Sequence, residues 1–176
     1  MKKGSFLALA AAALAASGCS TVAPPAAAND PDGLLDRMVG KWTLTGSIQG
    51  QDTVHDVQAE WVLNHEYVRL HEVSRERSSS GLPAYEAIVL LEWDKKSNDY
   101  SCLWLDNTVG GGLSNNGIAR GKRSGESVEF IFFPGGRNTF HNTMAYDQHS
   151  ELWTWVMDGE HDGKTEPFAR LTLHKR

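Results

Sequence analysis

Residues 84–106 have the sequence AYEAIVLLEWDKKSNDYSCLWLD, and this stretch determines the fold class. Residues 84–93 are apolar on both faces in the middle, which predicts a central strand of a sheet. The polar run at residues 94–99 is typical of a hairpin turn, and residues 100–106 return with strand-forming side chains. The stretch is therefore predicted to form an antiparallel β-hairpin.

The same pattern continues in both directions along the chain. Trp42, Leu44, Gly46 and Ile48 alternate with small polar residues, which indicates a half-buried strand. Further strands are predicted at residues 54–64, 67–75, 117–120, 127–133, 138–146, 151–157 and 167–175. A short helical turn at residues 34–39 is predicted to end at Gly40. The chain is thus expected to be all-β, as an antiparallel up-and-down barrel of about 8–10 strands or as a sandwich. The barrel is favoured because closure leaves no strand edge unpaired.

Gly40-Lys41-Trp42 follows the helical turn and opens the first strand, which resembles the G-x-W signature of lipocalin-like (calycin) proteins. In that family a basic residue of the last strand packs over the tryptophan, and the resemblance gives this role to Arg170. Residues 35–42, 62–70, 85–94 and 100–107 also resemble a family of bacterial lipocalin-like domains without an established function. Asn64-His65-Glu66 departs from that family, whose members tend to be glycine-rich there. The resemblance covers most of residues 34–176 and implies a calycin-like barrel, but it implies no particular activity.

The N-terminus has the three parts of an export signal. Lys2 and Lys3 precede an apolar stretch at residues 6–16, which is too short to span a bilayer. Small residues then lead to Cys19, so residues 1–18 are predicted to be a lipoprotein signal and Cys19 the lipidated residue. An ordinary secretory signal is the alternative, since Ala16 stands where Leu is commoner. Ser20 favours an outer-membrane lipoprotein facing the periplasm of a Gram-negative cell, with residues 19–33 as a flexible tether and residues 34–176 as one domain.

The composition argues against a nucleic-acid partner. The chain has 22 acidic and 17 basic residues, and Lys2 and Lys3 leave with the signal. If Cys19 is acylated, the other of the two cysteines, Cys102, has no disulfide partner and is expected to be a buried thiol. The sequence leaves the oligomeric state open.

Metal and cofactor motifs are weak. His65-Glu66 lacks the second histidine of a zinc-binding helix, because Arg69 occupies that position. Residues 158–163 mimic the start of a calcium loop but are interpreted as a hairpin turn. Haem ligated by an interior His71 or His141 is an alternative. The prediction is that the protein holds no metal and no cofactor.

Six tryptophans suit either a ligand cavity or a filled core. The leading hypothesis is a membrane-anchored barrel that binds a small apolar or amphipathic molecule. Tyr85 and Trp104 are predicted to line its wall, with Arg69, His71 and Asp106 as polar contacts. Its entrance is expected at glycines 110–112 and residues 78–81.

Two alternatives remain. One is an enzyme of unknown reaction that uses Glu86, Asp106 or His141 inside the barrel, with Glu86 and Asp106 as a candidate acid–base pair. The other is a ligand-free interaction lipoprotein whose barrel is filled by side chains.

Overall fold

The computed structural model describes residue 30 and residues 33–108, 115–135 and 137–176. The predicted signal, most of the predicted tether, Cys19 and glycines 110–112 lie outside the described residues. The elements are α1 (Leu34–Met38), β1 (Gly40–Ile48), β2 (Gln51–Val62), β3 (Tyr67–Ser74), β4 (Glu86–Asp94), β5 (Asp99–Asp106), a 3-10 turn (Asn115–Gly117), β6 (Ile118–Ser124), β7 (Ser127–Gly135), β8 (Asn138–Asp147), β9 (Leu152–His161) and β10 (Lys164–Lys175). Within this part of the chain, no helix is long and apolar enough to cross a membrane.

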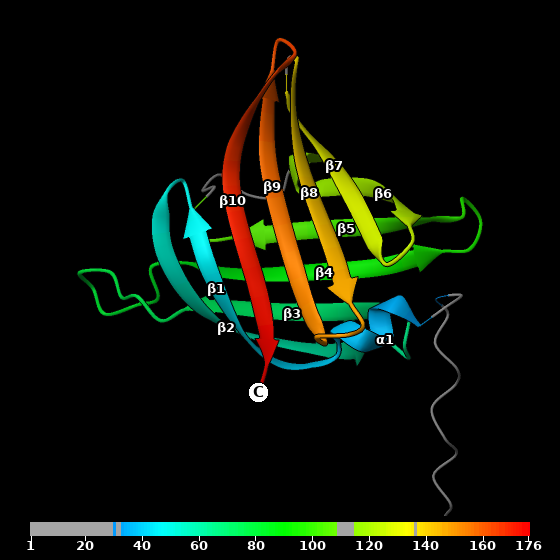
Figure 1. The fold of residues 1–176 in the computed structure, drawn as a ribbon, viewed down its shortest axis with the longest axis horizontal. Helices are drawn as coiled ribbons and strands as arrows, with labels where there is room; N and C mark the ends of the chain where they lie inside the picture. Colours follow the sequence, from blue (N-terminus) through cyan, green and yellow to red (C-terminus); the bar gives the residue numbers. More distant parts are fainter. Residues whose placement is uncertain (1–29, 31–32, 109–114, 136) are drawn as a thin grey trace, which may run out of the picture.

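The ten strands form one closed antiparallel barrel in which each strand pairs with its neighbours in sequence. Closure is made by β1 and β10, which pair from Trp42 opposite Lys175 to Ile48 opposite Ala169. The all-β up-and-down barrel is therefore confirmed. In Figure 1, β8, β9 and β10 cross in front of β3 and β4, so these two groups of strands form opposite walls of the barrel.

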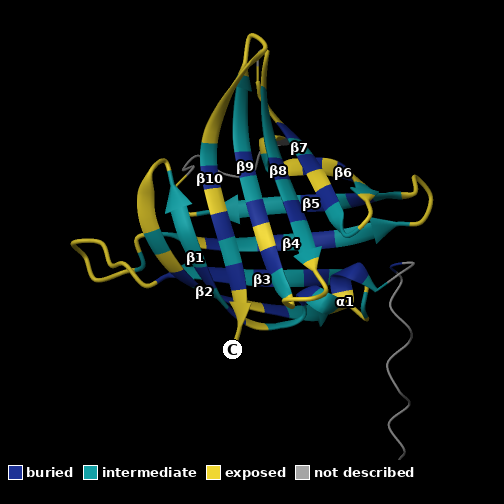
Figure 2. Ribbon diagram, in the orientation of Figure 1, coloured by how far each residue is buried: buried dark blue, intermediate teal, exposed yellow. Residues whose placement is uncertain are grey.

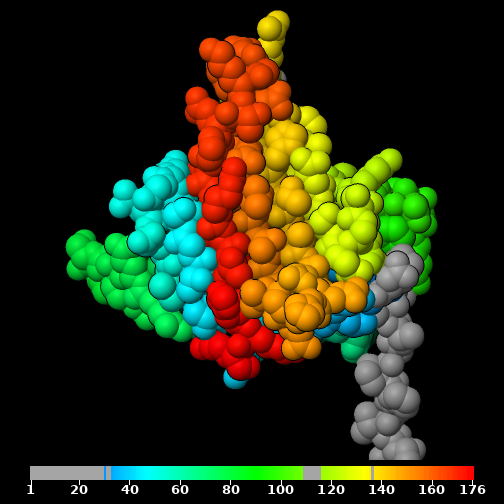
Figure 3. All heavy atoms as spheres, viewed as in Figure 1, coloured from blue at the N-terminus to red at the C-terminus, as the bar shows by residue number. Residues whose placement is uncertain are grey.

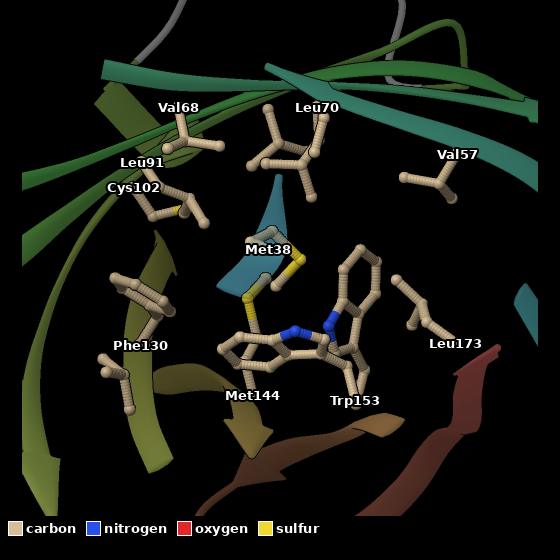
Figure 4. Close-up of a cluster of buried hydrophobic side chains, with 14 of the residues drawn as sticks. Met38, Val57, Val68, Leu70, Leu91, Cys102, Phe130, Met144, Trp153 and Leu173 are labelled. Atoms are coloured by element: carbon tan, nitrogen blue, oxygen red, sulfur yellow. The ribbon is translucent and has the colours of Figure 1, made fainter. Parts of the chain in front are cut away.

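One end of the barrel, called here the helix end, is closed by α1. Leu34, Leu35 and Met38 are buried, and Trp42 Nε1 donates a hydrogen bond of 2.7 Å to the Met38 carbonyl. Met38 lies between Leu70 of one wall and Met144 of the other (Figure 4). The helix thus acts as an apolar plug, and the helical turn that the sequence predicts is confirmed.

Asp30 fixes the start of the folded unit to this plug. Its carboxylate accepts hydrogen bonds from the Leu35 amide at 2.6 Å and from the Tyr100 hydroxyl at 2.5 Å. Asp30 is buried, although it falls within the predicted tether. The chain therefore enters the domain at the helix end.

The cation over Trp42 comes from Lys175, and this corrects the role expected of Arg170. Lys175 Nζ lies 5.8 Å from the centroid of the Trp42 ring. Arg170 is opposite Ser47 on the outer face, and its guanidinium bonds to the Met157 carbonyl at 2.9 Å and to Asp158 at 2.6 Å. The register of β1 against β10 is the reason, because it places the two basic residues at different heights of the same strand.

Burial follows the pleat of the strands. In β3, Val68, Leu70, Glu72 and Ser74 are buried and their neighbours in sequence are not. The same alternation is visible along the other strands, with exposed residues concentrated at the loops and at the tip of the β9–β10 hairpin (Figure 2). Side chains of β8, β9 and β10 form a continuous surface on the face shown in Figure 3.

Gly46 is expected to be essential for closure. It has φ 143°, and a Cβ there would lie 2.1 Å from the Arg170 carbonyl oxygen of β10. Gly46→Ala should lower the free energy of unfolding by about 2–4 kcal/mol, because it combines backbone strain with a steric clash. Urea denaturation measures this loss. Gly159→Ala is the control, since a Cβ there would lie 4.0 Å from the Glu166 carbonyl oxygen, which is an ordinary contact distance. An equal loss in both variants would contradict the explanation.

Candidate functional site

The barrel interior is apolar at the helix end and carries buried polar side chains farther from it. Among the described residues, the buried polar side chains on the barrel strands are His55, Glu72, Ser74 and Asn142, and all four face inward near the opposite end, called here the far end. They come from β2, β3 and β8, and each is at most 3 % exposed. Buried polar groups in an otherwise apolar barrel mark this half as the candidate site.

His55 lies at the centre of a short hydrogen-bonded chain. Its Nδ1 is 2.5 Å from Glu72 Oε1, and its Nε2 is 2.6 Å from the Thr53 hydroxyl oxygen. A neutral imidazole with its proton on Nδ1 satisfies both contacts, because it donates to Glu72 while the Thr53 hydroxyl donates to Nε2. The chain is possible because β2 and β3 pair with His55 opposite Ser74, which places Glu72 diagonally across from His55.

Aromatic side chains extend this chain across the interior. The Tyr85 ring stacks on His55 with centroids 5.4 Å apart, and Trp104 Nε1 donates a 3.0 Å hydrogen bond to the Tyr85 hydroxyl. Trp104 in turn meets Trp155 of β9 edge to face, with centroids 6.0 Å apart. These contacts connect β2 on one wall to β9 on the other. We call His55, Glu72, Tyr85, Trp104, Asn142 and Trp155 the interior polar cluster.

Three atoms of the interior polar cluster have no hydrogen-bond partner among the described residues. They are Glu72 Oε2, Asn142 Oδ1 and Trp155 Nε1. A buried polar atom without a partner costs about 1–3 kcal/mol, so such atoms call for an explanation. Two of them accept hydrogen bonds and one donates. The cluster can therefore bond a polar group that enters the barrel.

Three aromatic side chains of β7, β8 and β10 form an aromatic rim on one side of the far end. Phe140 packs against Phe132 and Phe168, with centroids 6.4 and 5.2 Å apart. Phe168 reaches this position because the register of β10 against β9 shifts between Pro167 and Ala169. Ile48, Phe140 and Phe168 pack against the core but remain partly exposed. Partly exposed apolar side chains therefore lie at the far end of the barrel.

Burial perturbs the ionisable groups inside the barrel. It raises the pKa of the Tyr85 hydroxyl. The charge of Glu72, and to a smaller extent that of Asp106, raises this pKa further, whereas the hydrogen bond from Trp104 lowers it. Burial also raises the pKa of the Cys102 thiol, which keeps it protonated and unreactive.

Two of the residues predicted to line the wall belong to the interior polar cluster, namely Tyr85 and Trp104. Asp106 is half-buried at the far end, where its carboxylate accepts hydrogen bonds from the Thr108 amide at 2.8 Å and the Thr108 hydroxyl at 2.6 Å. The structure therefore brings Tyr85 and Trp104 together and leaves Asp106 beside them.

Arg69 and His71 lie on the outer face, which corrects their prediction as interior anchors. Arg69 pairs with Glu60, and His71 Nε2 is 2.7 Å from Glu86. The alternation of β3 explains the difference, because Val68, Leu70 and Glu72 take the inner face.

The candidate catalytic residues of the enzyme hypothesis do not meet inside the barrel. Glu86 is exposed, so it does not pair with Asp106, and His141 lies on the outer face, 2.8 Å from Glu129. Neither His71 nor His141 can therefore reach a ligand inside the barrel. Residues 158–163 form the end of β9 and the turn into β10. No group of three potential metal-binding side chains occurs within the described part of the chain.

His55, Glu72, Asn142 and Trp155 are functional candidates that sequence reasoning missed. One signal was available, since Val57, Ala59 and Trp61 alternate onto one face and the same period places His55 there. Likewise, the apolar positions Val68 and Leu70 predict that Glu72 faces inward. The same period places Asn142 on the face of Phe140 and Met144, and it places Trp155 on the face of Trp153 and Met157.

The fold and the site together define a class: the protein is a closed antiparallel ten-stranded β-barrel, compatible with a calycin-like fold and with ligand binding. Comparison with models of protein families and with curated protein sequences gives no match.

Stability is expected to fall in alkaline solution. Burial raises the pKa of Cys102, Tyr85 and Tyr100. The native state therefore keeps protons that the unfolded chain releases above the ordinary pKa values, about 9.0 for cysteine and 10.0 for tyrosine. The free energy of unfolding should therefore decrease as pH rises past these values, by about 1.4 kcal/mol per pH unit for each group. Urea denaturation between pH 8 and pH 10.5 measures the slope. Cys102→Ala and Tyr85→Phe should each make it shallower, and an unchanged slope would contradict the assignment.

Proposed function

We propose that the protein is a membrane-anchored lipoprotein whose barrel binds a small apolar or amphipathic molecule through its far end. The observation that carries the proposal is the interior polar cluster, where three buried polar atoms lack a partner among the described residues beneath a partly exposed aromatic rim. The apolar part of such a ligand would contact the aromatic rim, and its polar end would contact the interior polar cluster. Ligand pockets in proteins commonly combine a mostly apolar lining with a few such polar groups.

The anchor belongs to the same proposal. The signal-like residues 1–18, Cys19 and Ser20 support an outer-membrane lipoprotein facing the periplasm. Asp30, which falls within the predicted tether, is bonded at the helix end, and this end is opposite the aromatic rim. A ligand can then enter or leave without displacing the plug formed by α1.

Ligand binding can be tested on the chain from residue 20 onward, which contains every described residue. The neutral apolar dye N-phenyl-1-naphthylamine is expected to bind with micromolar affinity and to quench tryptophan fluorescence, because Trp104 and Trp155 line the interior. Phe140→Arg places a charge in the rim and should weaken binding at least tenfold. Phe133→Arg is the matched control, since Phe133 is on the outer face and 65 % exposed. Absence of binding, or an equal effect of both variants, would contradict the proposal.

Hydrolysis is a second candidate function, favoured by one observation. Thr53, His55 and Glu72 are bonded in the order hydroxyl, imidazole and carboxylate, which is the arrangement of a catalytic triad. In such a reaction the Thr53 oxygen attacks an ester carbonyl while its proton moves to His55 Nε2. His55 then gives that proton to the leaving alkoxide, and water releases the acyl group from Thr53.

The hydrolase hypothesis predicts turnover of p-nitrophenyl butyrate that Thr53→Val and His55→Ala each reduce at least a hundredfold. His71→Ala is the control, because it removes an equally close histidine–glutamate pair from the outer face. Equal rates in the three variants would exclude this reaction and leave the binding function intact.

A further inference from the structure

We propose that the polar end of the ligand is an alkylammonium cation held by Glu72 and Asn142 among the aromatic rings of the interior polar cluster. This inference rests on the proposed binding function and names the chemical class of the ligand. The reasons come from charge, hydrogen bonding and ring geometry.

The charge of the far-end interior is acidic. The buried and half-buried polar side chains that face this half, among the described residues, are Thr53, His55, Glu72, Ser74, Tyr85, Asp106 and Asn142. The set contains two carboxylates and no Lys or Arg. The arginines nearest to Glu72 in sequence are paired on the outer face, Arg69 with Glu60 and Arg75 with Asp56. A cation is therefore favoured here and an anion is repelled.

Glu72 offers one carboxylate oxygen to such a cation. Oε1 is engaged by His55 Nδ1, whereas Oε2 is buried without a partner among the described residues. The Thr53 hydroxyl can donate to His55 Nε2, so His55 can hold Glu72 as a neutral imidazole and leave its negative charge uncompensated. Asn142 Oδ1 is a second unpartnered acceptor that faces the same interior. Both acceptors suit an ammonium group, which has only donors or, when methylated, only positive charge.

The aromatic rings complete the site. Trp104 and Trp155 meet at an interplanar angle of 72°, so their faces point in different directions and form a corner. The Tyr85 hydroxyl accepts a hydrogen bond from Trp104 and its ring stacks on His55, which adds a third aromatic ring beside Trp104. The faces of indole and phenol rings attract cations, and aromatic corners of this kind recognise ammonium groups. Trp155 Nε1, the unpartnered donor of the interior polar cluster among the described residues, suits an ether, hydroxyl or carbonyl oxygen beside the charge.

The same argument disfavours a fatty acid. Its carboxylate would lie near Glu72 and Asp106, with no guanidinium or ammonium group of the described residues to neutralise it. A long-chain alcohol would lack the repulsion but would gain no attraction from the carboxylate or the rings. The expected order of affinity is therefore cation, then neutral alcohol, then anion.

The test is competition against bound N-phenyl-1-naphthylamine, with dodecyltrimethylammonium, dodecylamine, dodecanol and dodecanoate, each below its micellar concentration. The two cations should displace the dye at concentrations at least tenfold lower than dodecanol, and dodecanoate should be the weakest competitor. Better displacement by the quaternary cation would assign the selectivity to the rings, whereas better displacement by the primary amine would assign it to hydrogen bonds from Glu72 and Asn142. This series needs no substitution, so it does not depend on a variant that folds.

Glu72→Gln keeps the shape of the side chain and removes its charge. It should abolish the preference for cations over dodecanol and leave the affinity for dodecanol within twofold. Glu86→Gln is the matched control, because Glu86 pairs with a histidine on the outer face. If all four competitors act alike, or if Glu72→Gln keeps the preference for cations, the inference is overturned while the binding function stands. If the dye itself does not bind, the binding function fails as well.

Discussion

Pairing of β1 with β10 is the constraint on which the rest of the structure depends. It joins the first strand to the last through seven consecutive residue pairs, from Trp42 opposite Lys175 to Ile48 opposite Ala169. Because this pairing closes the sheet, every strand acquires an inner and an outer face, and no edge is left for another chain to extend. The close approach of Gly46 to the Arg170 carbonyl shows how tightly the two strands meet. Without closure, His55 and Glu72 would be polar residues on an open sheet.

The interior is divided between stability and function. At the helix end, α1, Trp42 and Trp153 fill the barrel with apolar side chains, and Asp30 fastens the entering chain to Tyr100. At the far end, the same inward positions carry the interior polar cluster. Burying those groups opposes folding unless they are bonded, so the apolar half supplies stability that the polar half lacks. This division explains how a small barrel can keep unpartnered polar atoms and remain folded.

Much of the architecture follows from local pattern, and the site follows only in part. The hairpin at residues 84–106, the short helix before Gly40 and the number of strands are encoded in alternation and turn residues, which act over a few positions. The error at Arg69 and His71 has a definite cause, since a shift of one residue exchanges the two faces of a strand. Tyr85 and Trp104 contact each other inside the barrel, and their role in lining a ligand site stays a prediction.

The sequence by itself determined that the chain forms a strand meander with a glycine–tryptophan start, because backbone propensity and period-two patterning are local properties. Only the tertiary structure decided which side chains meet. His55 and Glu72 are 17 residues apart, and Trp104 reaches Trp155 from the opposite wall. It likewise decided that Lys175, and not Arg170, covers Trp42. The physical reason is that contacts between distant strands depend on the register of every pairing around the closed barrel, and no local pattern specifies all of those registers together.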